Sequence, residues 1–325
     1  MRRRDFIKVI GGGAVAWPLV ARAQQSTMPV IGFISGTWPD ANRLRALRQG
    51  LKDSGYIEGE NVIITYGWAE GRFERLPAMI AELIRRQVAV IVPVGTPPTL
   101  AAATATKTIP ITFVIGEDPV RLGIVASLSR PGGNATGINL VSLELAAKRL
   151  ELLRELLPQT ARVAVLVNPA DAATAESTLK DVQPAAHTIG LRVQILNAST
   201  AAEIDTAFAT IARERPDAIF VASDPFFTSR RVQLANLASR HVIPMICSTR
   251  EITEAGGLMS YGSNVPDAWR QLGAHTGRVL NGAKPADLPV VQASKFELVI
   301  NIQTAKILGL TVPPALLARA DDVIE

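Results

Sequence analysis

Short apolar runs alternate with longer amphipathic segments along this chain, and that alternation constrains the fold more than any other feature. The first run, Val30–Ile34, is followed by Leu44, Leu47 and Leu51, whose spacing predicts one buried helix face. Most of the runs are apolar throughout, which is typical of parallel strands that are covered on both faces. The order of the runs therefore predicts an α/β protein with doubly wound parallel sheets.

A loop rich in glycine and proline, PGGNATG at 131–137, interrupts the pattern, which then starts again. We expect strands at 30–34, 62–66, 88–92 and 111–115 before this loop and at 162–167, 191–196, 218–222 and 244–246 after it. Each half is long enough to bury a core of its own. The later segments at 258–261 and 295–301 are too short for a third domain. We therefore expect them to complete two doubly wound parallel-sheet lobes, joined by a hinge that the chain crosses more than once.

The N-terminal residues have the layout of a cleaved export signal. A basic start through Lys8 precedes a short apolar run at 9–20 and the cleavage pattern ARA at 21–23. The segment RRDFIK at 3–8 resembles the twin-arginine signal, which implies export by the twin-arginine translocase. We therefore expect a periplasmic protein that is soluble after cleavage near Ala23. No other apolar run approaches the length of a membrane span.

The basic charge of the chain belongs mostly to this signal. Residues 1–23 hold five basic residues and one acidic residue, so removing them lowers the formal net charge from +5 to +1. A net charge this small gives no reason to expect a nucleic acid partner.

Several enzyme and cofactor classes lack their motifs in this chain. The single cysteine, Cys247, excludes an internal disulfide, and three separated histidines favour no metal site. No glycine-rich nucleotide motif follows a strand, and neither His187 nor His275 lies in the pattern of a Ser-His-Asp triad. We therefore expect no catalytic residue, no metal and no cofactor.

Ligands of open parallel sheets bind beyond the carboxyl ends of the strands. The loops at these ends supply the candidate binding residues: Ser35, Gly36, Thr37, Trp38, Gly95, Thr96, Asp118, Asn168, Asp224, Ser248 and Tyr261. The same residue types are also ordinary helix N-caps.

The candidates have the chemistry of a site for a zwitterion. Hydroxyl groups and free backbone N–H groups at helix starts suit a carboxylate, and they belong to Ser35, Thr37, Gly95 and Thr96. An ammonium would donate a charge-assisted hydrogen bond to Asp118 or Asp224. Trp38, Tyr261 and Phe226 would cover an apolar or aromatic side chain.

Several short segments resemble one family of proteins. They include IGFISGT at 31–37, GYIEGENV at 55–62, VGTP at 94–97, DPV at 118–120, RPGGNATG at 130–137 and GGLMSYG at 256–262. These segments resemble the periplasmic substrate-binding proteins of ABC transporters, type I fold, in the tryptophan-type subgroup. The likeness runs from about residue 29 to residue 310.

The resemblance implies a clamp of two lobes that closes on a small solute and delivers it to an ABC permease in the inner membrane. It also implies a first lobe at 28–139 plus 247–290 and a second lobe at 140–246 plus 291–325. The candidate loops favour an apolar or aromatic amino acid as the solute. Two alternatives stay open: a ligand-sensing partner of a membrane receptor, and a two-lobed enzyme such as a glycosyltransferase.

Overall fold

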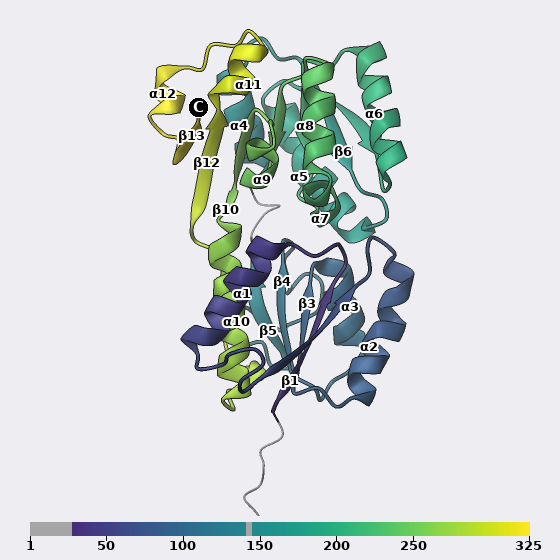
Figure 1. The fold of residues 1–325 in the computed structure, drawn as a ribbon. Helices are drawn as coiled ribbons and strands as arrows, with labels where there is room; N and C mark the ends of the chain where they lie inside the picture. The colour runs from purple at the N-terminus through teal and green to yellow at the C-terminus, as the bar shows by residue number, and fades with distance from the viewer. Residues whose placement is uncertain (1–27, 141–144) are drawn as a thin grey trace, which may run out of the picture.

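The computed structural model describes residues 28–140 and 145–325, which form two lobes, one above the other in Figure 1. Each lobe is built on a mainly parallel sheet with helices packed on both faces. The predicted α/β class with two doubly wound lobes is therefore confirmed. The predicted export signal, its twin-arginine motif and the cleavage near Ala23 lie outside the described residues.

The sheet of the first lobe has the strand order β11-β5-β4-β3-β1-β2, and all of its pairings are parallel. Its strands are β1 (Val30–Ser35), β2 (Ile63–Trp68), β3 (Val90–Val94), β4 (Ile111–Ile115), β5 (Ala135–Asn139) and β11 (Val291–Gln292). The central strands β3, β4 and β5 are buried over their whole length. The apolar runs of β3 and β4 thus reflect cover on both faces. Strand β5 overlaps the segment 131–137, which was expected to be a loop.

Two pairs of helices cover the first sheet. Its helices are α1 (Ala41–Asp53), α2 (Leu76–Arg85), α3 (Thr96–Ala105) and α10 (Val265–Leu280), with short 3-10 turns η1 (Phe73–Arg75) and η2 (Pro285–Asp287). Helices α1 and α10 share one core with the sheet, which includes Phe33, Leu47 and Leu272. Helices α2 and α3 share a second core with it, which includes Ile80 and Ala102.

Helices α1 and α10 pack at very short range through two glycines. A Cβ atom at Gly50 would lie 1.8 Å from the carbonyl oxygen of Arg270, and one at Gly273 would lie 2.1 Å from the carbonyl oxygen of Leu47. Only residues without a side chain allow backbones to approach so closely. The contact matters for the site, because α10 follows a crossing from the second lobe and is fixed against the first lobe here.

The sheet of the second lobe has the strand order β13-β12-β10-β9-β8-β6-β7. Its strands are β6 (Arg162–Val167), β7 (Arg192–Asn197), β8 (Ala218–Val221), β9 (Met245–Cys247), β10 (Met259–Ser263), β12 (Phe296–Asn301) and β13 (Asp322–Ile324). Its helices are α4 (Ala146–Leu156), α5 (Ala172–Thr188), α6 (Ala201–Glu214), α7 (Pro225–Ser229), α8 (Arg231–Arg240), α9 (Arg250–Glu254), α11 (Ile302–Ile307) and α12 (Pro314–Leu317).

One pairing in this sheet is antiparallel, that of β10 with β12. Strand β10 leaves the second lobe towards α10, whereas β12 enters it after β11 of the first lobe. The two strands therefore run in opposite directions. The chain crosses between the lobes at three places, from β5 to α4, from β10 to α10 and from β11 to β12 (Figure 1).

The strand pairing differs from the expected lobe boundaries on either side of α10. We expected 247–290 in the first lobe, but β10 pairs with β9, Met259 opposite Ile246 and Ser260 opposite Cys247, so 247–263 lies with the second sheet. Strand β11, expected in the second lobe, pairs with β5 in the first. An apolar run predicts that a strand is buried, but it does not predict which neighbour that strand pairs with.

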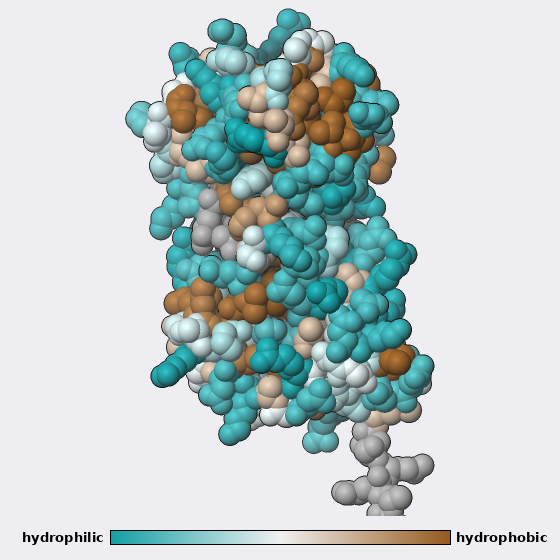
Figure 2. Space-filling model, turned by 90° about the vertical axis from the view of Figure 1, so that its left-hand side faces the viewer, coloured by the Kyte–Doolittle hydropathy of each residue, from teal (hydrophilic) through white to brown (hydrophobic). Residues whose placement is uncertain are grey.

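The surface on the hinge side is mostly hydrophilic, with hydrophobic residues in separate patches over both lobes (Figure 2). Within residues 28–140 and 145–325, no helix combines the length and the apolar character needed to cross a bilayer.

Candidate functional site

Two adjoining cavities lie between the lobes, at the carboxyl ends of the parallel strands. The larger, of about 280 Å³, is named here the tryptophan chamber, because Trp38, Trp68 and Trp269 line it. The smaller, of about 70 Å³, is named the acidic chamber, because Glu117, Asp171 and Asp224 line it. Both cavities share the wall residues Arg43, Val94, Pro225, Thr228 and Trp269.

The acidic chamber gathers carboxylates from both lobes. Glu117 follows β4 of the first lobe, and its two oxygens accept the hydroxyls of Thr96 on α3 and Thr174 on α5. Asp171 is the N-cap of α5, and its carboxylate accepts the backbone N–H of Thr174 at 3.2 Å. Since Thr174 belongs to the second lobe, its bond to Glu117 joins the lobes across the chamber.

The third carboxylate, Asp224, is the N-cap of α7. One oxygen accepts the backbone N–H of Phe226 at 2.6 Å, and the other accepts Nδ2 of Asn168 at 3.1 Å. Glu117, Asp171 and Asp224 are 4%, 4% and 6% exposed. All three are thus nearly removed from water.

Burial disfavours the charged forms of these acids. Burial, followed by the nearby charge of Asp171, raises the pKa of Asp224 to about 7. Burial, followed by the charge of Glu117, raises the pKa of Asp171 to about 6. A cation between them would stabilise the carboxylate forms. No group of three acidic, histidine or cysteine side chains in the described part of the chain could hold a metal ion.

Three separate segments of the first lobe supply the aromatic side chains of the tryptophan chamber. Trp38 follows β1, Trp68 ends β2, and Trp269 lies on α10. Phe33 packs against both Trp68 and Trp269. Its ring centre lies 5.2 Å from that of Trp68 and 6.0 Å from that of Trp269. Flat aromatic walls of this kind suit a ligand with an apolar or aromatic part.

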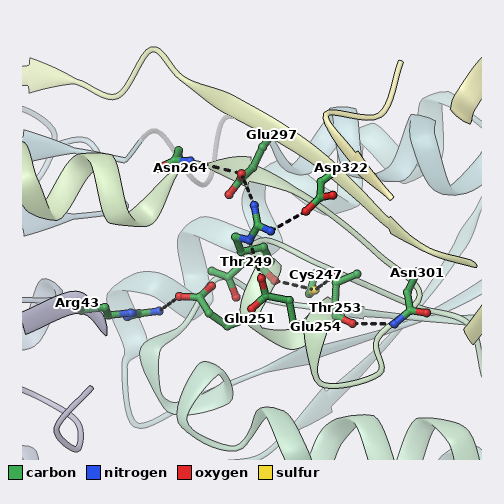
Figure 3. Close-up of polar contacts among 11 residues, drawn as sticks. Arg43, Cys247, Thr249, Glu251, Thr253, Glu254, Asn264, Glu297, Asn301 and Asp322 are labelled. Atoms are coloured by element: carbon green, nitrogen blue, oxygen red, sulfur yellow. Dashed lines mark hydrogen bonds and ion pairs between the residues drawn. The ribbon is translucent and has the colours of Figure 1, made fainter. Parts of the chain in front are cut away.

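Arg43 lies where the two chambers meet. Asp40 caps α1 and brings this arginine to the first turn of the helix, facing the cleft. Its Nη2 atom donates to Oε1 of Glu251 on α9 at 3.0 Å, and the guanidinium lies 6.0 Å from the centre of the Trp269 ring. Figure 3 shows Arg43 and Glu251 reaching towards each other from separate elements. Arg43 is the basic side chain that lines the acidic chamber within the described ranges.

The structure places most of the predicted site residues on these walls. Those that line a chamber are Ser35, Thr37, Trp38, Gly95, Thr96, Asp224 and Ser248. Two others adjoin wall residues: Gly36 lies between Ser35 and Thr37 in the chain, and Asn168 donates to the carboxylate of Asp224. The contact of each residue with a ligand stays a prediction.

Three predicted residues lie elsewhere. Asp118 lines a separate cavity beside Arg121 and Lys180, and its carboxylate accepts the N–H of Val120 at 2.8 Å in its own turn. Tyr261 packs against the core of the second lobe, and Phe226 is buried within that core. The roles proposed for them in holding an ammonium or covering a side chain gain no support from these positions.

The start of α3, at Gly95 and Thr96, has fewer free backbone N–H groups than we expected from the sequence. Residues 97 and 98 are prolines without an N–H group, and the N–H of Thr99 already donates to the carbonyl of Gly95 at 3.2 Å. The N–H of Gly95 donates to Val114. Only the N–H of Thr96 therefore remains at this helix start for a carboxylate.

The wall residues that the sequence analysis missed include Arg43, Trp68, Glu117, Asp171, Arg230, Arg231 and Trp269. Two of them had a usable signal. Glu117 lies in the same loop as the chosen Asp118, and Asp171 follows the chosen Asn168 by three residues, at the start of a helix. Arg43 and Trp269 lie within helices, where a rule based on strand ends does not look.

The chain shows clear similarity to known proteins. Residues 27–324 match the family described as ABC transporter substrate binding protein. A tyrosine-binding protein of Clostridioides difficile is 27% identical over 263 residues, which cover 81% of this chain and 75% of that protein.

Solved structures show the same similarity. An ABC domain of Streptococcus pneumonia in complex with L-Trp is 26% identical, with a TM-score of 0.81, and the match covers 91% of this chain and 99% of that one. A conserved domain protein of Vibrio cholerae is 29% identical, with a TM-score of 0.82 and the same coverage.

Proposed function

The chain belongs to the family of ABC transporter substrate-binding proteins, whose members are solute receptors, and from this premise we propose that its solute is an aromatic amino acid. One observation carries the proposal: a cluster of buried carboxylates, an arginine and three tryptophans line adjoining chambers between the lobes. An aromatic amino acid carries the matching ammonium, carboxylate and ring. The tyrosine named for one relative and the L-Trp bound by another are of this class.

The ammonium group is assigned to the acidic chamber. Asp224 and Asp171 are buried acids with raised pKa values, and Glu117 lies with them. Leaving several carboxylates buried without a cation is costly, and an ammonium among them would form charge-assisted hydrogen bonds. The chamber is therefore best occupied by a ligand with a primary ammonium group.

The carboxylate group is assigned to the junction of the chambers. Arg43 lines both cavities there, and the N–H of Thr96 is the free donor at the start of α3. Ser35 and Thr37, which share a hydrogen bond of 3.2 Å between their hydroxyls, lie on the wall nearby. An arginine with its planar set of donors suits a carboxylate better than hydroxyls alone.

The ring of the ligand is assigned to the tryptophan chamber. Its volume of about 280 Å³ is near the lower end of the range of ~300–1,000 Å³ for small-ligand pockets, which suits an amino acid. Ring edges and faces from Trp38, Trp68 and Trp269 would contact an aromatic side chain from several sides.

The proposed cycle includes opening and closing of the lobes about the three crossings. Contacts between the lobes lie on the walls of the cleft, such as that of Thr174 with Glu117 and that of Arg43 with Glu251. A ligand that touches both walls would favour the closed form by hinge closure. The closed form would then dock on a permease of the inner membrane and release the solute, without catalysis.

The cellular setting proposed here follows from the sequence. Export by the twin-arginine translocase and cleavage near Ala23 would place the mature chain in the periplasm, where such a receptor meets its solute. The mature chain would carry a formal net charge of only +1 and would bind no nucleic acid.

The test is a thermal-shift screen followed by titration calorimetry on the mature chain. Aromatic amino acids should raise the melting temperature, with a stabilisation of about 2.7 kcal/mol at a ligand concentration of 100 times Kd. Two matched analogues test the head group: the amine without a carboxylate and the acid without an ammonium should each bind much more weakly. A clear response to sugars or nucleosides and none to amino acids would overturn the proposal.

A further inference from the structure

The tryptophan chamber carries more positive charge than an apolar side chain needs. Arg43, Arg230 and Arg231 line it, and within the described ranges Asp40 is the acidic residue on its wall. The Oδ1 atom of Asp40 already accepts the backbone N–H groups of Asn42 and Arg43 at 3.0 and 3.1 Å. The chamber therefore has an excess of hydrogen-bond donors, which calls for an acceptor on the ligand.

Arg230 is the arginine whose position is fixed by aromatic rings. It lies between α7 and α8 of the second lobe, and its guanidinium carbon is 4.9 Å from the centre of the Trp38 ring of the first lobe. The same carbon is 5.9 Å from the ring centre of Phe226. Stacking of this kind holds a guanidinium in place and leaves the N–H groups at its edge free to donate.

The Nε atom of Arg230 is buried and has no hydrogen-bond partner among the described residues. The Nε atom of Arg43 is also buried without a hydrogen-bond partner among the described residues, but its Nη2 atom donates to Glu251 at 3.0 Å. Arg231 donates through Nη1 to the carbonyl of Thr228 at 3.3 Å. Arg230 is thus the wall arginine to which the described protein groups offer aromatic faces but no hydrogen-bond acceptor. An oxygen on the ligand ring would complete its contacts.

Aromatic amino acids differ in what they offer to such a group. A phenyl ring has no polar atom, and an indole has an N–H donor only, which cannot pair with another donor. A phenol oxygen accepts hydrogen bonds, and bonds to a charged donor are stronger than neutral ones. We propose that Arg230 recognises the ring oxygen of a phenolic amino acid, so that the receptor prefers tyrosine to phenylalanine and tryptophan.

A different role for Arg230 would be to hold the carboxylate of the amino acid. Arg230 lines the tryptophan chamber but not the acidic chamber, whereas Arg43 lines both. The carboxylate and ammonium of an amino acid are bonded to the same carbon, so the carboxylate must stay beside the acidic chamber. This geometry gives the carboxylate to Arg43 and leaves Arg230 for the ring.

The proposal rests on the proposed function and predicts a ratio of affinities. Tyrosine and phenylalanine differ by one oxygen, so their dissociation constants are compared by calorimetry for the natural chain and for Arg230→Met. The natural chain should bind tyrosine roughly ten-fold or more tightly than phenylalanine, as expected for one hydrogen bond to a charged donor. Arg230→Met should bring the two affinities together, mainly by weakening tyrosine.

Arg240→Met is the matched control, because it removes the same charge at the exposed end of the same helix. It should leave both affinities and their ratio unchanged. Equal binding of tyrosine and phenylalanine by the natural chain would overturn the proposal. Equal weakening of both by Arg230→Met would also overturn it, since Arg230 would then hold the lobes together or bind the carboxylate. Failure to bind any aromatic amino acid, with binding of another solute class, would instead refute the proposed function.

Discussion

The guanidinium of Arg43, on α1 of the first lobe, donates to the carboxylate of Glu251, on α9 of the second lobe, at 3.0 Å (Figure 3). The two side chains are only 14% and 18% exposed. Arg43 also lies at the junction of the two chambers. The pair therefore links the contact between the lobes to the place where we propose that the ligand carboxylate binds.

Replacing Glu251 by Gln should weaken ligand binding by roughly ten-fold. The change keeps the shape of the side chain but removes the charge that joins Arg43 of the first lobe to α9 of the second lobe in the closed form. Calorimetric titration with the tightest aromatic amino acid measures the effect.

Glu254→Gln on the same helix is the control. Glu254 is 48% exposed and pairs with Arg250 at 2.7 Å within the second lobe, so its loss should leave the affinity unchanged. If both variants bind like the natural chain, Arg43 and Glu251 play no part in closure.

Asp224→Asn should weaken binding of an aromatic amino acid by roughly ten-fold or more, because it removes a charge that we assign to the ammonium. The amide can still accept the N–H of Phe226, so the cap of α7 should survive. Asp118→Asn is the matched control, since the Asp118 carboxylate lies in a separate cavity and bonds within its own turn. A larger loss from the Asp118 variant would move the ammonium site to that cavity.

The affinity of the protein for an aromatic amino acid should rise with pH between about 5 and about 8. Burial raises the pKa of Asp224 from its ordinary value of 3.8 to about 7, so the empty folded chain binds this proton more tightly than the unfolded chain does. The empty chain therefore loses stability as the pH rises from about 4 to about 7, and not above that. An ammonium ligand requires the carboxylate form, so its binding is easier once the proton has left.

Three neighbouring side chains act on the carboxyl group of Asp224 as it titrates. Asp171 and Glu117 repel its negative charge, and Asn168 donates a hydrogen bond to it. The shift of the melting temperature caused by the ligand should thus be larger at about pH 8 than at about pH 5. Asp224→Asn should flatten this dependence. A ligand-induced shift that is larger at low pH would contradict the assignment.

Much of the fold could be predicted, because an apolar run such as 111–115 is buried on both faces whichever strands pair with it. The strand expected at 88–92 is found two residues later, at 90–94. The rule on strand ends also found Thr96, Asp224 and Ser248. It could not choose between Glu117 and Asp118, which are adjacent, because the turn decides which carboxylate enters the cleft. Asp118 accepts the N–H of Val120, whereas Glu117 accepts hydroxyls from both lobes.

Other residues of the site reach the cleft through tertiary packing, which no local pattern shows. Arg43 and Trp269 lie on α1 and α10, two helices that are more than 200 positions apart in the chain. They meet the same cavity because Gly50 and Gly273 let those helices touch. The pairing of β10 with β9 is likewise not visible in a local pattern, and it differs from the expected lobe boundary.

That helix contact gives a prediction about stability. Gly50→Ala and Gly273→Ala should each destabilise the chain by at least the ~1–3 kcal/mol typical of overpacking, because a Cβ would lie 1.8 or 2.1 Å from a backbone oxygen. The melting temperature should fall by roughly 2–4 °C per kcal/mol for a chain of this size.

Gly133→Ala is the control, because nothing lies within 4 Å of the position of its Cβ. Thermal unfolding followed by circular dichroism measures all three, and a Gly50 or Gly273 variant as stable as the Gly133 variant would show that α1 and α10 can separate without loss. Because these helices carry Arg43 and Trp269, folded variants should also bind ligand more weakly, while Gly133→Ala should bind as the natural chain does.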